Sequence, residues 1–127
     1  MSLQSPLRKA LGLGSAKEGV GHWWAQRLTA IALVPLGLWF VFSMLGLDYG
    51  SYDIVRAWIA APAHAILLIL LLVTLLYHAC LGLQVVIEDY LQGVARVVAL
   101  IGMQFMVIVM AAGGLYAVVV ISVGGSQ

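Results

Sequence analysis

His78 lies deep inside a long stretch of the chain that carries no charged residue, Ala57–Ile87. The hydrocarbon core of a bilayer is about 30 Å thick and is crossed by roughly 20 apolar residues of α-helix, so this stretch can span it. An imidazole in hydrocarbon is costly unless it has a partner, which makes His78 a candidate functional residue. Two interpretations are open from this pattern alone. His78 either binds the iron of a haem as an axial ligand or hydrogen-bonds to a neighbouring helix.

Four other residues are spaced so that they could act together with His78. Gly82 follows one helical turn later and leaves room beside the backbone for a large planar ring. Asp89 and Tyr90 follow after about three turns, some 16 Å along the helix, where the membrane meets water. Arg27 precedes the first apolar span and could pair with the propionates of a haem. Asp89 and Tyr90 could equally form a solvated helix end, and Arg27 could be a snorkelling cation.

A second histidine of the same span, His64, requires a separate interpretation. It lies nearly four turns before His78 and roughly on the same face of the helix. Two ligands on one helix cannot hold opposite sides of one haem iron, although they could hold two stacked haems. Pro62 is typical of the first turn of a helix, which places His64 near the outer end. We therefore expect an interfacial or structural histidine.

Two other stretches, Leu28–Leu47 and Val97–Gln127, are also free of charge and long enough to cross a bilayer. Of the 127 residues, 64% are hydrophobic and 9% are charged. A soluble domain carries about 25% charged residues. We therefore expect an all-α integral membrane protein that forms one three-transmembrane-helix bundle in contact with lipid.

The boundaries of the expected elements follow from these stretches. An N-terminal segment takes in 1–20, and the membrane-anchor domain takes in 21–127. Pro35 would kink the first span, and Asp48–Asp53 reads as a turn-rich loop after it. Gly113-Gly114 in the third span would allow close approach of another helix. The three spans are expected at about 27–47, 60–88 and 96–122.

The distribution of Lys and Arg predicts the orientation of the chain. Four basic residues precede the first span and Arg96 follows the second, whereas Arg56 alone follows the first. The positive-inside rule then places the N-terminus in the cytoplasm of a bacterium, or in the matrix for a mitochondrial inner membrane. The net charge of +1 gives no reason to expect nucleic acid as a partner. The four N-terminal basic residues are Arg8, Lys9, Lys17 and Arg27.

Two motifs of the chain resemble those of a known family. The first is His78-Ala79-x-x-Gly82 followed by Asp89-Tyr90, and the second is Arg27-Leu28-Thr29-Ala30 with His22 shortly before it. Together with three spans, they resemble the small hydrophobic membrane-anchor subunit of succinate dehydrogenase, respiratory complex II, of the cytochrome b556 type. The resemblance covers the chain from about Gly19 to its end.

The resemblance implies a role for each of these residues. His78 would be the axial ligand that this subunit gives to haem b, and the large cytochrome b anchor subunit would give the other. Arg27 would face the haem propionates, with Gly82 beside the ring. Tyr90 would hydrogen-bond a carbonyl of ubiquinone, and Asp89 would support that site.

The resemblance also implies partners. His22 would complete the cofactor-binding set at the cytoplasmic end, where the iron–sulfur subunit docks. A flavoprotein subunit would oxidise succinate, so this chain would not be a catalyst by itself. It would help to bind haem b and form part of the ubiquinone reduction site.

Two alternatives remain from the residues. The chain could be a haem b subunit of another respiratory oxidoreductase, in which His64 and His78 hold two haems. It could also be a small transporter or scaffold without haem. Small multidrug transporters usually have four spans and an acidic residue inside the first, and this chain has neither feature.

Overall fold

The computed structural model of the chain describes residues 15–124, with side chains described from residue 19 onward. This part of the chain consists of four helices and contains no strand. The helices are α2 (Ser15–Leu45), α3 (Tyr52–Ala60), α4 (Pro62–Tyr90) and α5 (Gly93–Gly124). Three of them are long and apolar enough to cross a membrane, over Gly19–Leu45, Pro62–Tyr90 and Gly93–Gly124. The all-α architecture with three spans is therefore confirmed.

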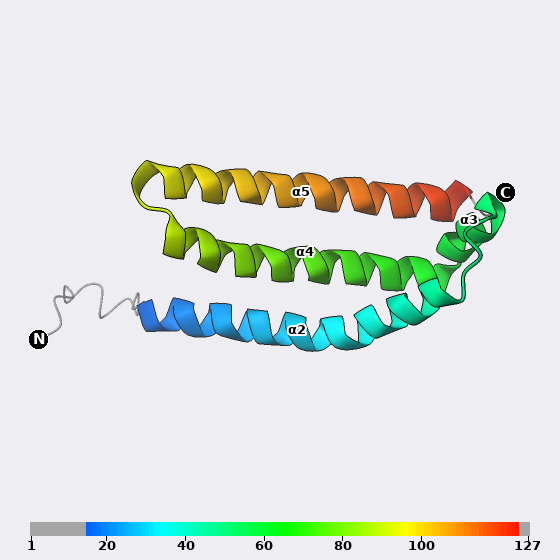
Figure 1. Cartoon of the computed structure of the whole chain (residues 1–127), viewed down its shortest axis with the longest axis horizontal. Helices are drawn as coiled ribbons and strands as arrows, with labels where there is room; N and C mark the ends of the chain where they lie inside the picture. The colour runs from blue at the N-terminus through cyan, green and yellow to red at the C-terminus, as the bar shows by residue number, and fades with distance from the viewer. Residues whose placement is uncertain (1–14, 125–127) are drawn as a thin grey trace, which may run out of the picture.

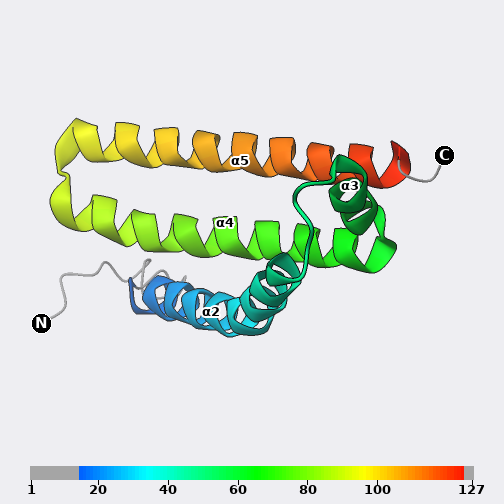
Figure 2. The same cartoon turned by 45° about the vertical axis from the view of Figure 1, so that its right-hand side comes forward.

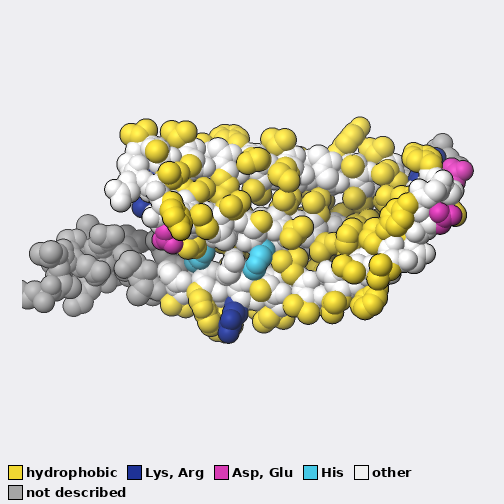
Figure 3. All heavy atoms as spheres, in the orientation of Figure 1, with side chains coloured by type: hydrophobic (Ala, Val, Ile, Leu, Met, Phe, Trp, Pro, Cys, Tyr) yellow, Lys and Arg dark blue, Asp and Glu magenta, His cyan; other side chains and the backbone are white. Residues whose placement is uncertain are grey.

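The long helix α4 lies in the middle of the arrangement (Figure 1). It packs against α2 on one side and α5 on the other, whereas no Cα atom of α2 comes within 8 Å of one in α5 among the described residues. Ala65, Leu81 and Met103 are the only apolar side chains buried in this part of the chain. Hydrophobic side chains cover most of the face in Figure 3, and acidic side chains gather at its two ends. Such a surface suits lipid or further transmembrane helices.

The helix α2 differs from the expected first span at its beginning. It begins at Ser15 rather than near residue 27, so His22 and Arg27 lie inside it. Hydropathy marks the part of a helix that lies in hydrocarbon, whereas the backbone ladder of hydrogen bonds continues through Gly19 and Gly21. The expected N-terminal segment, 1–20, falls mostly outside the described residues. Pro35 lies inside α2, where a proline removes a helical hydrogen bond, and α2 is bent (Figure 2).

The helix α3 was not expected from the sequence. A helix of 9 residues begins at Tyr52, inside the loop that was predicted at Asp48–Asp53. This helix contacts both α4 and α5. Ala61 then adopts an extended backbone (φ −62°, ψ 126°), the conformation that a following proline favours. The helix α4 begins at Pro62, close to the predicted position.

Contacts among α2, α3, α4 and α5 fix the end of the molecule that carries α3. His64 donates its Nδ1 proton to the carbonyl of Trp58 over 2.8 Å, and its ring stacks on the Trp58 ring at 4.5 Å. Trp39 of α2 also stacks on the ring of Trp58, with 5.8 Å between the two ring centroids. Arg56 donates to the carbonyl of Gly124 over 2.6 Å and so caps α5. These contacts support the structural role expected for His64.

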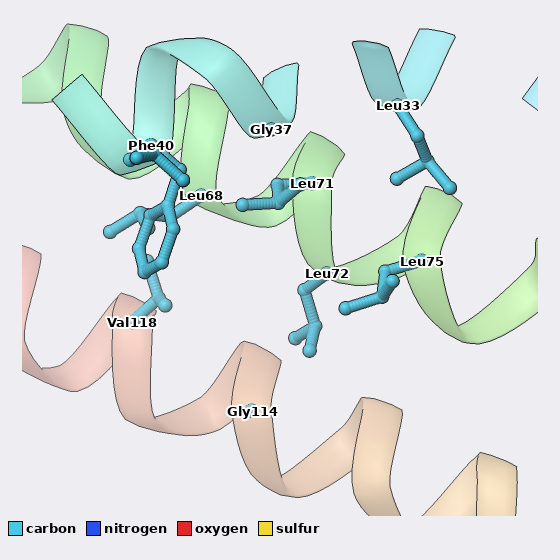
Figure 4. A pocket seen from close by; sticks show the side chains of 10 residues that line it. Leu33, Gly37, Phe40, Leu68, Leu71, Leu72, Leu75, Gly114 and Val118 are labelled. Atoms are coloured by element: carbon cyan, nitrogen blue, oxygen red, sulfur yellow. The ribbon is translucent and has the colours of Figure 1, made fainter. Parts of the chain in front are cut away.

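The interface between α4 and α5 depends on Gly114. A Cβ atom on Gly114 would overlap the side chain of Leu72, whose Cδ1 would lie 3.3 Å away, whereas a Cβ on Gly113 would meet nothing within 4 Å. Of the predicted Gly113-Gly114 pair, Gly114 is therefore the residue that permits close approach. Beside this contact, α2, α4 and α5 enclose an apolar groove of about 520 Å³ whose lining includes Gly37, Leu72 and Gly114 (Figure 4).

We predict that Gly114→Val destabilises the protein and that Gly113→Val does not. The branched side chain at Gly114 must displace Leu72 and separate α4 from α5, which should cost about 1–3 kcal/mol. The midpoint of thermal unfolding in mild detergent measures the difference. Equal midpoints for the two variants would show that Leu72 moves into the groove without cost.

Candidate functional site

His78 is held by a hydrogen bond to α2. Its Nδ1 lies 2.9 Å from Oγ1 of Thr29, and the same hydroxyl donates to the carbonyl of Ala25 over 2.7 Å. A hydroxyl has one proton, so Oγ1 accepts from Nδ1–H while it donates to Ala25. With the Thr29 proton directed at Ala25, the ring proton of a neutral His78 lies on Nδ1, and Nε2 then carries a lone pair that can bind a metal.

The chemistry available to this part of the chain is that of a single histidine ligand. No group of three His, Cys, Asp or Glu residues that could hold a metal ion occurs among the described residues. A haem does not need such a group, because the porphyrin itself supplies four nitrogen ligands and the protein adds axial ones. A half-buried imidazole with its Nδ1 proton engaged and its Nε2 available fits that requirement.

The space above Gly82 is occupied by the side chain of Gln26. The Nε2 atom of Gln26 lies 3.6 Å from the position that a Cβ on Gly82 would take, which is an ordinary van der Waals distance. The Oε1 atom of Gln26 is buried and has no hydrogen-bond partner among the described residues. The Nε2 atom of His22, one turn earlier on α2, is likewise buried and without a partner in that part of the chain. Histidine side chains are visible between α2 and α4 in Figure 3.

Arg27 is not brought close to His78 within this chain. It precedes Thr29 by two residues on α2, or about 200° around the helix, so it projects from the opposite face of the helix. Its side chain is exposed, and its guanidinium carbon lies 5.3 Å from the centre of the Trp23 ring. That contact is a cation–π interaction.

Asp89 and Tyr90 form the last turn of α4, and both are exposed. Tyr90 is 83% exposed. Neither side chain makes a hydrogen bond or ion pair within the described part of the chain. Their neighbour Glu88 is engaged instead, because it accepts from Gln84 Nε2 over 3.0 Å and pairs with Arg96 at 3.5 Å. Gly93, with φ of 61°, provides the left-handed turn that brings Arg96 back to Glu88.

The sequence identified His78 as a candidate site residue. It did not show that Thr29 hydrogen-bonds to His78 or that Gln26 lies over Gly82. A threonine in a helix ordinarily bonds to the carbonyl four residues earlier, so its type alone does not indicate an interhelical contact. A signal was present in the spacing. His22, Gln26 and Thr29 recur at four and three residues, which places three polar side chains on one face of an otherwise apolar helix.

Comparison with known proteins gives a consistent assignment. Residues 1–121 match the family model described as the succinate dehydrogenase/fumarate reductase transmembrane subunit. The succinate dehydrogenase hydrophobic membrane anchor subunit of Rickettsia bellii is 45% identical over 83 residues, which are 65% of this chain and 66% of that protein. The subunit of the same name from Paracoccus denitrificans is 35% identical over 100 residues, 76% of this chain and 75% of that protein.

A third relative also matches the chain. The succinate dehydrogenase membrane anchor subunit of Reclinomonas americana is 32% identical over 88 residues, 67% of this chain and 73% of that protein. The match spans about two thirds of the length of the Rickettsia bellii protein. No solved structure matches the chain. With three apolar spans and a match over 1–121, the chain belongs to the family of succinate dehydrogenase/fumarate reductase transmembrane subunits.

Proposed function

We propose that this chain is the hydrophobic membrane-anchor subunit of a succinate:quinone oxidoreductase, and that it helps to bind haem b and quinone. The observation that carries the proposal is the hydrogen bond between His78 and Thr29, which leaves Nε2 available inside a membrane span. The resemblance and the relatives supply the context of a complex. The expected partners are a flavoprotein, an iron–sulfur subunit and a large cytochrome b anchor subunit.

His78 would be one axial ligand of haem b, and a histidine of the large anchor subunit would be the other. When bound, the haem supplies a carrier for single electrons. Thr29 would hold the ring of His78 in one tautomer and orientation, the usual role of a residue that hydrogen-bonds to a ligating histidine. Arg27 is exposed on α2 and is therefore accessible to a propionate of a group shared with another subunit.

Tyr90 and Asp89 would form part of the ubiquinone site. Both are exposed at the end of α4, where a quinone head group can meet water-borne protons and an electron donor in another subunit. A phenol is a hydrogen-bond donor suited to a quinone carbonyl, and a carboxylate beside it can orient it or exchange protons. Their exposure in this chain leaves both side chains available to a substrate held between subunits.

The chain is a multi-pass membrane protein, and we propose that it lies in a bacterial inner membrane, or a mitochondrial one, with its N-terminus in the cytoplasm or matrix. The five basic residues on that side support this orientation. A reporter enzyme that is active only outside the cytoplasm should then be active when it is fused after Gln127. Cytoplasmic reporter activity would contradict the orientation.

We predict that a complex purified by a tag on this chain contains a flavoprotein, an iron–sulfur protein and haem b, and that His78→Ala removes or shifts the haem absorbance. Thr29→Val should retain haem but shift its midpoint potential, because the ring of His78 loses its hydrogen bond. Reduced-minus-oxidised spectra of the assembled variants measure both effects. Unchanged spectra and haem content in the His78→Ala complex would rule out ligation.

We predict that Tyr90→Phe lowers the rate of quinone reduction by about one to two orders of magnitude, or about 1.4 kcal/mol per tenfold. The substitution keeps the aromatic ring at the membrane edge and deletes only the hydroxyl. Tyr77→Phe is a matched control, because Tyr77 is an exposed tyrosine of the same helix. Rates are normalised to succinate oxidation with an artificial acceptor that bypasses quinone. Wild-type rates and unaltered inhibitor sensitivity for Tyr90→Phe would place the residue outside the site.

A further inference from the structure

Two buried polar atoms of α2 lack a hydrogen-bond partner among the described residues, and they lie one turn apart. These atoms are Nε2 of His22 and Oε1 of Gln26. Leaving a polar group buried and unpaired is unfavourable, and an apolar side chain at the same position would avoid that penalty. The described residues therefore give neither atom a hydrogen bond. Their arrangement points to a polar partner outside the described part of the chain.

The two side chains face α4 rather than lipid. Gln26 lies over Gly82, and three residues further along α2 Thr29 bonds to His78. Because α2 and α4 run in opposite directions (Figure 1), a step from Thr29 back to His22 corresponds to a step from His78 toward Asp89. His22 is about 10 Å from Thr29 along the helix axis. The pair therefore lies between the depth of His78 and the end of α4.

The chemistry of the pair selects the kind of ligand. An amide presents a donor or an acceptor according to its rotation about the terminal bond, and an imidazole does so according to its tautomer. Neither group changes its charge in doing so. They suit an oxygen that accepts a hydrogen bond in one state and donates one in another. A haem propionate only accepts and is better matched by a cation, and Arg27 projects from the opposite face of α2.

We propose that His22 and Gln26 together bind one oxygen of the quinone head group and hold it both before and after reduction. A quinone carbonyl oxygen accepts a hydrogen bond from the pair. Addition of two electrons and two protons turns both carbonyls into hydroxyls, and the hydroxyl then donates to the pair. This inference rests on the proposed function and adds Gln26, a residue without a role in the resemblance, to the binding site.

The experiment measures the affinity of the purified complex for a short-tailed ubiquinone analogue and for its quinol. Gln26→Leu and Gln26→Met remove the amide, and Met keeps the unbranched stem. Both should raise the Kd for the quinone and for the quinol about tenfold, equivalent to about 1.4 kcal/mol. Gln104→Leu is the matched control, because Gln104 is an exposed glutamine of α5, and its Kd should equal that of the wild type. The midpoint potential of the haem is measured on the same samples.

Four results would overturn the inference. Kd values within twofold of wild type for both Gln26 variants would show that the amide does not touch the quinone. A shifted haem potential with unchanged Kd values would assign the pair to a propionate instead. Failure of both variants to assemble would show that the amide has a partner in folding. A wild-type complex that binds no quinone analogue would overturn the proposed function as well, whereas the other results leave that function intact.

Discussion

The hydrogen bond between Thr29 and His78 is the interaction on which the rest of the site depends. Inside a bilayer, apolar contact alone gives helices little reason to choose one another over lipid, so polar contacts and close packing determine the arrangement. The Thr29 hydroxyl makes polar contacts in two helices. It donates to the carbonyl of Ala25 within α2 and accepts from Nδ1 of His78 on α4. It thereby fixes which face of α2 meets α4 and which nitrogen of His78 remains available.

The consequence of this arrangement is an open structure with α4 at its centre. The backbones of α2 and α5 stay apart, and both helices pack against α4, through Thr29 on one side and Gly114 on the other. The helix α3 adds a second contact for each, through Trp39 of α2 and through the carbonyl of Gly124 in α5. An apolar groove remains between the three helices (Figure 4). A soluble protein would collapse such a groove to bury apolar surface, whereas in a membrane lipid or a neighbouring helix can fill it at little cost.

The parts of this structure that could be predicted are those fixed by local sequence. The three spans follow from the absence of charge, and the beginning of α4 follows from Pro62. The helix α3 could not be predicted from charge or hydropathy, because its contacts with α4 and α5 hold it in place. The depth of His78 in a charge-free span indicated that its ring needs a polar partner, and Thr29 is that partner within the chain. The direction in which Arg27 projects could not be predicted, because only the contact between Thr29 and α4 shows which face of α2 meets α4.

The two ends of the described structure differ in whether their buried polar atoms have hydrogen-bond partners. At the end that carries α3, His64 bonds to the backbone of Trp58, and Arg56 bonds to Gly124. These groups are satisfied within the chain and stabilise it. At the other end, His22 and Gln26 hold buried atoms without partners in the described structure. Unpaired polar groups are costly in a membrane. At the end that retains them, an external ligand can offset that cost through new hydrogen bonds.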